Sequence, residues 1–337
     1  MLIKKLTDAN GLPGNEGEIR SIIKEELEGH VDSMLTDRMG NLIVTKNAGK
    51  PGKHIGLSAH MDEVGMLVKR VEDSGLIRMG LFGLDPRILP SKIVVIGKDK
   101  VKGVIGTKPV HMTKADERAK AIELDALYID IGASSKEEAE KSVSMGDFVY
   151  FDSEFTEFGE HKIKAKALDD RAGCGIIIEV LKSDIKTPVT AVFCVQEEVG
   201  LRGSMAAANR VSADMFVNLE GTVSADMPPN EDYEKVTVLG DGPALSLIDR
   251  SSVYLKEYVN KMTAVAEENA IPYQFRRTGA GGTDAGNYHT AHGGTPVIGV
   301  AVPCRYLHSP VSVMDKRDYE NAIKLVKAFI NKYGEEQ

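Results

Sequence analysis

Two adjacent carboxylates, Glu197 and Glu198, follow directly on the apolar run TAVFCVQ. Neighbouring residues of a strand point to opposite faces, so two carboxylates at the end of a buried strand need two different partners. Polar residues stand at the ends of other apolar runs in the same way. They are His60 and Asp62 in SAHMDEVG, Glu220 in VNLEGT and His308 in VPCRYLHSP, while Asp169 and Asp170 begin a helical segment in KALDDRAG. Since sites in open α/β sheets form outside the carboxyl ends of the strands, these residues are expected to converge.

Each of these residues taken singly has an ordinary explanation, such as a helix cap, a solvated turn or a hydrogen-bonded structural histidine. Their coincidence at one sheet edge favours a single site. No Lys or Arg falls among these positions, although Arg171 and Arg202 lie close in sequence. Buried carboxylates without cations normally require a metal.

The donor set indicates which metals would bind. Imidazole nitrogen and carboxylate oxygen without thiolate suit Zn²⁺ or Co²⁺, with Mn²⁺ as a further possibility. Two histidines and three or four carboxylates exceed the three protein ligands of a single catalytic zinc, but they suffice for two ions that share a bridging carboxylate. One further carboxylate would stay off the metals and carry a proton.

The elements that would position these residues alternate between strand and helix. Helical periodicity covers residues 16–32, 169–183, 251–270 and 315–334, and strand-like runs cover 54–68, 187–195, 213–220 and 296–302. This alternation predicts a three-layer α/β/α domain with a central, mostly parallel sheet. Between them, short β-like runs and glycine turns predict a small β-rich, barrel-like insertion. We therefore expect a discontinuous catalytic domain over 1–65 and 163–337, and an inserted domain over 66–162.

The composition excludes several classes of protein. A chain of 337 residues is expected to form two domains. No apolar run approaches the roughly 18 residues that span a bilayer, and the N-terminus lacks a signal-peptide pattern, so a cytoplasmic protein is expected. The net charge of −8 argues against a nucleic-acid partner. Cys174, Cys194 and Cys304 are widely spaced in apolar stretches and are expected to be buried free thiols.

Five motifs in order, namely SAHMDEVG, ALDDRAG, VQEEVGLRG, an acid that ends a strand, and RYLHSPVS, resemble the glutamyl and deblocking aminopeptidases. These are co-catalytic dinuclear metallopeptidases of the tetrahedral aminopeptidase type. The resemblance covers nearly the whole chain, and in that family the inserted β domain is the dimerisation domain. It implies a metal-dependent aminopeptidase that hydrolyses N-terminal residues from short peptides through a metal-bridging water. It also implies two divalent metal ions per subunit and self-association as dimers that build a dodecamer.

The resemblance also assigns roles by position. It implies Glu197 as the general base and Asp62 as the acid that orients the His60 ring. The implied metal ligands are His60, Asp169, Glu198, Glu220 and His308. Many family members have aspartate where this chain has Glu220. On the residues alone, either Asp169 or Asp170 could be the bridging ligand, the other capping the helix.

The family places a substrate loop at TGAGGTDAGNYHT, which makes Gly282, Thr283 and Asp284 candidate substrate-binding residues. The alternative is a glycine turn followed by an aspartate helix cap. His289 and His292, further along this segment, are expected at the surface. The side-chain preference, the native metal and the choice between dimer and dodecamer stay open.

Other functions remain compatible with the sequence. A two-metal carboxypeptidase, dipeptidase or deacylase shares the same chemistry. Relatives of this kind have also been labelled endoglucanases, but this chain has no Trp and only 6% aromatic residues for sugar stacking. A catalytically silent assembly protein is the alternative from another class.

Overall fold

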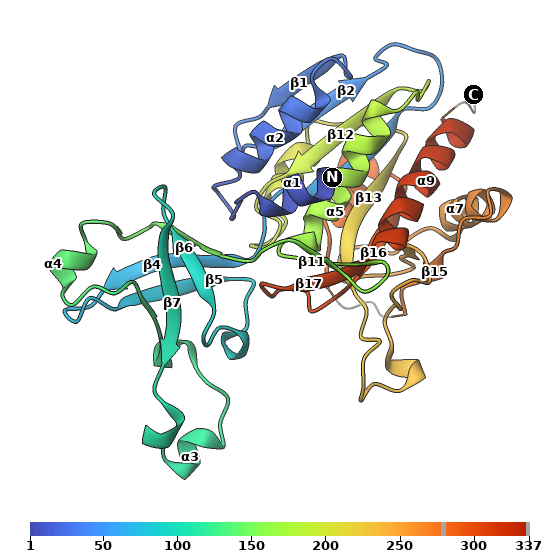
Figure 1. Ribbon diagram of the computed structural model, residues 1–337. Coiled ribbons are helices and arrows are strands. Elements are labelled where there is room, and N and C mark those ends of the chain that lie inside the picture. Colours follow the sequence, from blue (N-terminus) through green and yellow to red (C-terminus); the bar gives the residue numbers. More distant parts are fainter. Residues whose placement is uncertain (278–280, 335–337) are drawn as a thin grey trace. The chain divides into compact units, whose positions relative to one another are not determined.

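The computed structural model describes residues 1–277 and 281–334, which form two compact units (Figure 1). The larger unit comprises Met1–Glu63, Phe155–Leu307 and the chain from Val311 onward. The smaller unit comprises Val64–Glu154 together with His308–Pro310. Each unit has a hydrophobic core of its own.

The larger unit is built on one mixed sheet. Its strands are β1 (Ser33–Thr36), β2 (Leu42–Lys46), β3 (Ile55–His60), β10 (Thr156–Phe158), β11 (Lys162–Ala165), β12 (Val189–Cys194), β13 (Met215–Val223), β14 (Ala244–Leu245), β15 (Gln274–Phe275), β16 (Val297–Arg305) and β17 (Ser312–Asp315). The strand order is β1-β2-β12-β3-β13-β16-β17-β11-β10, with β14 and β15 beside β16. Strands β12, β3, β13 and β16 are parallel, and the pairs on either side of them are antiparallel.

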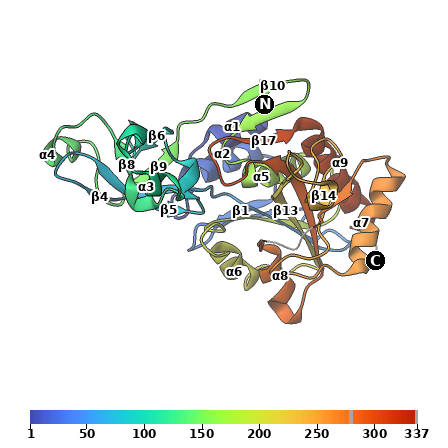
Figure 2. The same cartoon turned by 90° about the horizontal axis from the view of Figure 1, so that it is seen from below.

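Helices cover both faces of this sheet. They are α1 (Leu2–Asp8), α2 (Gly17–Leu27), α5 (Leu168–Lys182), α6 (Arg202–Ala208), α7 (Lys256–Glu268), α8 (Ala285–Thr290) and α9 (Lys316–Tyr333). Helix α5 packs on β3 and β13 with α1, α2 and α9 around it, whereas α6 and α8 pack against β12, β13 and β16 on the other side (Figure 2). The predicted three-layer α/β/α arrangement with a central parallel sheet is confirmed.

The pattern of apolar residues in helices α5 and α9 matches how far each helix is enclosed by its neighbours. Helix α5 is enclosed by the sheet and by other helices, and its consecutive residues Ile176, Ile177 and Ile178 are all fully buried. Helix α9 is amphipathic: it buries Leu325 and Phe329 in the same core and exposes polar residues on its other side. Burial of such side chains is the main stabilising contribution to the layer.

The smaller unit is a closed six-stranded antiparallel barrel. Its strands are β4 (Gly65–Val71), β5 (Ile77–Phe82), β6 (Ile93–Ile96), β7 (Val101–Thr107), β8 (Leu127–Asp130) and β9 (Phe148–Phe151), and it also carries the short helices α3 (Ala115–Arg118) and α4 (Lys136–Ala139). The strands close in the order β4-β5-β8-β7-β6-β9, with every neighbouring pair antiparallel. Val68, Ile96 and Ile129 are among the residues that fill its interior. The expected β-rich, barrel-like insertion is therefore confirmed.

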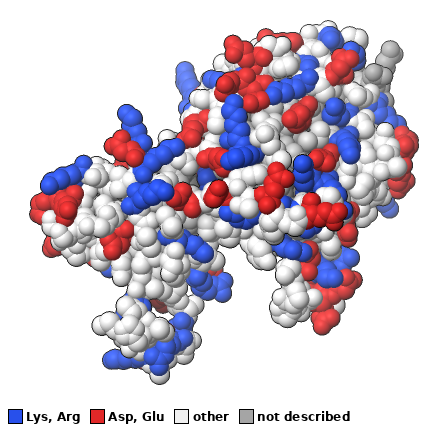
Figure 3. Space-filling view, in the orientation of Figure 1, with Lys and Arg blue, Asp and Glu red and all other residues white. Residues whose placement is uncertain are grey.

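The helices, the surface charges and the cysteines can be compared with the expectations drawn from the composition. Over residues 1–277 and 281–334, no helix combines the length and the apolar character needed to cross a membrane. Acidic and basic side chains are interspersed on the face drawn in Figure 3, rather than gathered by sign. The three cysteines are free and buried, as predicted.

Candidate metal centre

The parallel strands bring the predicted residues of the larger unit to one sheet edge. His60 is the last residue of β3, and its register partner Cys194 is the last residue of β12. Glu197 and Glu198 follow β12 within four residues, so they lie beside His60. Glu220 comes from β13 on the other side of β3, and Asp169 and Asp170 come from the start of α5.

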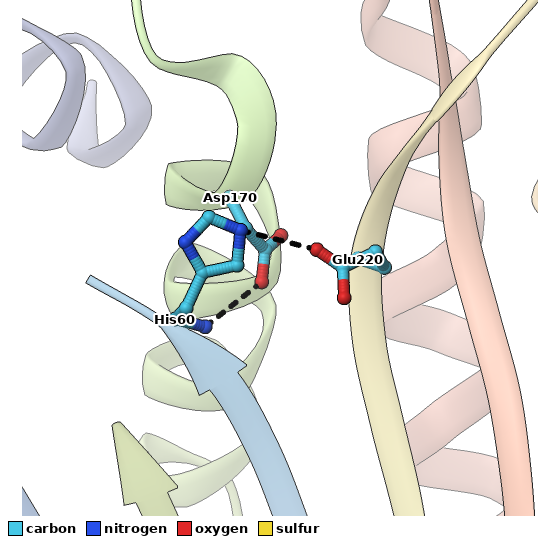
Figure 4. A group of neighbouring side chains, drawn as sticks. All are labelled: His60, Asp170 and Glu220. Carbon is cyan, nitrogen blue, oxygen red and sulfur yellow. Dashed lines mark hydrogen bonds and ion pairs between the residues drawn. The ribbon is translucent and has the colours of Figure 1, made fainter. Parts of the chain in front are cut away.

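The His60 ring lies at the centre of this group. It is 1% exposed, and its Nε2 lies 3.2 Å from Glu220 Oε1, 3.3 Å from Asp169 Oδ1 and 3.9 Å from Glu197 Oε2. Figure 4 shows the His60 ring and the Glu220 carboxylate pointing toward each other from two neighbouring strands. Three carboxylates that converge on one imidazole nitrogen form the donor arrangement of a metal site.

Glu220 is held by residues that sequence reasoning missed. Its Oε2 accepts a hydrogen bond from Asn218 Nδ2 at 3.3 Å, and Asn218 Oδ1 in turn accepts one from Ser58 Oγ at 2.7 Å. Both Asn218 and Ser58 are buried in the sheet. The signal was a polar residue two positions before Glu220 on the same strand face. This bond engages one oxygen and leaves Oε1 directed at His60.

Asp62 contacts both the His60 ring and the glutamate pair. His60 Nδ1 lies 3.0 Å from the backbone carbonyl of Asp62 and 3.7 Å from its carboxylate. The carboxylate also accepts from the backbone N–H of Glu197 at 2.9 Å and from that of Glu198 at 3.0 Å. Asp62 thus contacts the ring through both its backbone carbonyl and its carboxylate, and it holds the backbone of the glutamate pair through the carboxylate.

Asp169 and Asp170 differ in what their oxygens contact. Asp170 is fully buried, and its two oxygens accept from Gly173 N at 2.8 Å and from His60 N at 3.2 Å. The Asp169 side chain is 15% exposed and directs Oδ1 at the His60 ring. Asp170 thus accepts from the backbone of both segments, and one of its oxygens also lies within 4.8 Å of ligand atoms of His60 and Glu220, while Asp169 directs Oδ1 at the ring.

The turn after the glutamate pair is set by backbone requirements. Gly200 has φ +112°, which L side chains rarely adopt. Gly203 donates to the carbonyl of Val195, and a Cβ at Gly203 would lie 2.2 Å from that oxygen. These glycines serve the bend and its packing.

The carboxylates around His60 repel one another because few positive charges lie among them. Burial, together with repulsion from neighbouring carboxylates, raises the pKa of Glu197 to about 11 and that of Glu220 to about 8. Burial opposes protonation of His60, but the Glu197, Asp169, Asp62 and Glu220 carboxylates raise its pKa well above the usual value. Bound divalent cations would replace the protons that such a cluster otherwise retains, so these residues fit a metal centre.

Removal of metal is expected to make stability strongly pH-dependent. Glu197 and Glu220 have folded-state pKa values of about 11 and about 8 against an ordinary value of 4.5, so the folded metal-free protein binds more protons than the unfolded chain above pH 4.5. The free energy of unfolding therefore falls as the pH rises from about 4.5 toward these folded-state pKa values. Melting temperatures of chelator-treated protein should fall from about pH 5 to about pH 9, whereas Zn²⁺-loaded protein should change little. Equal pH profiles for the two forms would contradict the prediction.

The predicted substrate loop lies partly within the described residues, since Thr278–Ala280 fall outside them. Asp284 is 1% exposed and does not cap α8; its Oδ1 accepts a hydrogen bond from Ser204 Oγ. Thr283 N donates to Ser251 Oγ at 3.1 Å, and a Cβ at Gly282 would approach nothing closer than 3.6 Å. The Asp284 charge contributes to the raised pKa of both Glu197 and Glu220.

Three other histidines of the predicted motifs, His289, His292 and His308, each lie near a backbone carbonyl oxygen. His289 Nδ1 lies 3.1 Å from the carbonyl of Thr295, and His292 Nε2 lies 3.2 Å from that of Val211. His308 follows β16, groups by its contacts with the barrel unit, and has Nδ1 2.7 Å from the carbonyl of Gly83.

Comparison with known proteins identifies the family. The family model described as M42 glutamyl aminopeptidase matches residues 40–325. This chain belongs to the M42 glutamyl aminopeptidase family. Its members are metal-dependent hydrolases, so the resemblance drawn from the motifs is confirmed, and the chain is an M42 metallo-aminopeptidase family protein.

Individual relatives and solved structures match over nearly their whole length. The chain is 30% identical to the lysyl aminopeptidase of Pyrococcus furiosus, with 98% of this chain and 96% of that protein covered. The solved structure of an aminopeptidase from Desulfurococcus kamchatkensis has a TM-score of 0.93 at 36% identity and covers 98% and 94% of the two chains. The Pyrococcus horikoshii TET1 peptidase, which can assemble into a tetrahedron or a large octahedral shell, has a TM-score of 0.87 at 33% identity and 98% coverage of both chains.

Proposed function

We propose that this chain is an aminopeptidase that removes N-terminal residues from short peptides. The reaction would use two divalent metal ions per subunit, for which Zn²⁺ and Co²⁺ are favoured over Mn²⁺. The observation that carries this proposal is the convergence of Asp169, Glu197 and Glu220 on the Nε2 atom of His60, within 3.9 Å. The membership in the M42 family supports the same reaction.

The proposal gives each donor a role. His60 and Glu220 would hold the first ion, Glu198 and His308 would hold the second, and Asp169 would be a ligand of both. When bound, the two ions would polarise the scissile carbonyl and lower the pKa of the attacking water. Glu220 extends one methylene further than the aspartate of many members, and Asn218 holds its Oε2 while its Oε1 lies 3.2 Å from His60 Nε2.

Glu197 is the proposed proton carrier. Its side chain is 12% exposed, so it is shielded from bulk water yet reachable from the centre. It would take the proton from the attacking water and deliver it to the leaving amine. Asp62 fixes the backbone of Glu197 and Glu198 with one carboxylate oxygen each, which holds the base and the neighbouring ligand in a constant relation.

The barrel unit is the proposed dimerisation domain, with dimers that build a dodecamer. The shells formed by the TET1 peptidase of Pyrococcus horikoshii support this part of the proposal. We also propose Gly282, Thr283 and Asp284 as part of the surface that receives the N-terminal residue of the substrate.

A panel of aminoacyl p-nitroanilides, assayed with each of the three metals, tests the function. We expect hydrolysis of at least one free aminoacyl substrate and none of its N-acetylated counterpart, since the site should require a free α-amino group. Comparable cleavage of N-acetylated substrates would favour the carboxypeptidase, dipeptidase or deacylase alternative. Hydrolysis of carboxymethylcellulose would favour an endoglucanase, and failure to bind any of the metals would favour a silent assembly protein.

A further inference from the structure

Beside the metal centre the larger unit buries three charged residues that the proposed reaction does not use. Glu63, Lys166 and Arg171 are 2%, 4% and 0% exposed. Lys166 Nζ donates to both oxygens of Glu63 at 2.7 and 2.8 Å, and Arg171 Nη2 donates to Glu63 Oε1 at 3.2 Å. We call these three residues the buried ion cluster.

The cluster binds the N-terminal segment of the chain to the scaffold of the site. Arg171 Nη1 donates to the carbonyls of Leu6 at 2.5 Å and Ala9 at 3.0 Å, and Lys166 Nζ donates to the carbonyl of Ala9 at 2.8 Å. Glu63 N donates to the carbonyl of Gly11 at 2.9 Å, and Gly11 N donates back to Glu63 Oε1 at 3.0 Å. A Cβ at Gly11 would lie 2.8 Å from Arg171 Nη2, so only glycine fits there without displacement.

The same cluster joins the two segments that carry the proposed ligands of the first metal. Glu63 lies three residues after His60, while Lys166 and Arg171 flank Asp169 on either side. Arg171 Nε also donates directly to the carbonyl of Met61, between His60 and Asp62, at 2.9 Å. A displacement of the cluster would therefore change the separation between the His60 ring and the Asp169 carboxylate.

Stability alone does not account for this arrangement. Burying three charges has a large desolvation cost, and well-packed apolar residues of similar volume are often equally or more stable. Buried ion pairs with complete hydrogen bonding instead fix the geometry of their surroundings. A planar guanidinium can satisfy all its donors in only a few arrangements of its partners. Residues that hydrogen-bond around metal ligands typically alter metal affinity by about 10–100-fold when changed.

We propose that the buried ion cluster Glu63–Lys166–Arg171, with the segment Leu6–Gly11 bound to it, is a positioning device that presets the spacing of His60 and Asp169 for the first metal ion. This inference rests on the proposed two-metal function. None of the three residues contacts the substrate, so each acts through the ligands that it positions.

Titration of the metal-free full-length protein with Co²⁺ tests the proposal, with the dissociation constant and the visible ligand-field spectrum as readouts. Arg171→Lys retains the buried charge but concentrates its donors on one nitrogen, which cannot reach Met61, Leu6 and Glu63 together. We expect Arg171→Lys and Glu63→Gln to bind the first Co²⁺ about 10–100-fold more weakly than wild type, with an altered spectrum.

Asp315→Asn provides a matched control. The Asp315 side chain is also fully buried and also accepts from a lysine and an arginine, Lys162 and Arg317, but it serves the start of α9. The Asp315→Asn substitution should lower the melting temperature without changing the affinity for Co²⁺. If Glu63→Gln fails to fold, Arg171→Lys decides.

The outcomes separate the two proposals. Wild-type Co²⁺ affinity and spectrum in Arg171→Lys, alongside a wild-type enzyme that binds Co²⁺ and hydrolyses aminoacyl anilides, would overturn the positioning role alone. A wild-type protein that binds no divalent cation would overturn the proposed function, and the positioning role with it.

Discussion

Replacing Glu197 by glutamine is expected to lower kcat by about three orders of magnitude while metal content and melting temperature stay close to wild type. Glutamine has nearly the same shape but its amide cannot accept the proton of the attacking water. The backbone bond from residue 197 to Asp62 is kept, so the strand end should not move. Steady-state kinetics and elemental analysis on the same preparation provide the measurement.

The neighbouring substitution Glu198→Gln is the matched control. It changes the same functional group one position along the same turn, and the backbone of residue 198 is held by the same aspartate. We expect it to reduce the number of bound metal ions, which Glu197→Gln should not do. Near-normal turnover in Glu197→Gln, or loss of metal from it, would show that Glu197 is not the base.

The rule that sites in open α/β sheets form outside the carboxyl ends of the strands accounts for much of what the sequence predicted. It placed His60, Glu197 and Glu220 at one edge because β12, β3 and β13 are parallel neighbours, and the structure brings their side chains together. The rule concerns backbone direction alone. It therefore did not reveal that Asp62 would direct its carboxylate at two backbone N–H groups, which depends on how the turn after β12 closes.

Long-range polar contacts were the part that the sequence did not reveal. Arg171 was noted only as a residue close to the acids, yet it is fully buried and bonded to carbonyls of the N-terminal segment more than 160 residues away in sequence. Helical periodicity also predicted a helix from residue 251, whereas α7 begins at Lys256. The intervening residues form a turn because Asp249 Oδ1 accepts from the N–H groups of Ser251 and Ser252.

Asp169→Asn is expected to abolish binding of at least one metal ion and to reduce activity by about three orders of magnitude or more. A bridging carboxylate uses both oxygens and a full negative charge, whereas an asparagine offers one neutral oxygen. Because the Asp169 charge repels the Glu220 carboxylate, its replacement should not lower the melting temperature of the metal-free protein. Metal content by elemental analysis and the melting temperature of the chelated protein are the two measurements.

Asp170→Asn should give the opposite pattern, although it makes the same chemical change one residue along. Asp170 accepts from two backbone N–H groups, Gly173 and His60, and an asparagine must turn its own N–H₂ toward one of them. The unpaired backbone donor costs about 1–3 kcal/mol, so the melting temperature should fall while metal ions still bind. If instead Asp170→Asn loses metal and Asp169→Asn retains it, Asp170 is the bridging ligand. The two variants together therefore assign the bridge, which the sequence left open between two adjacent and chemically identical residues.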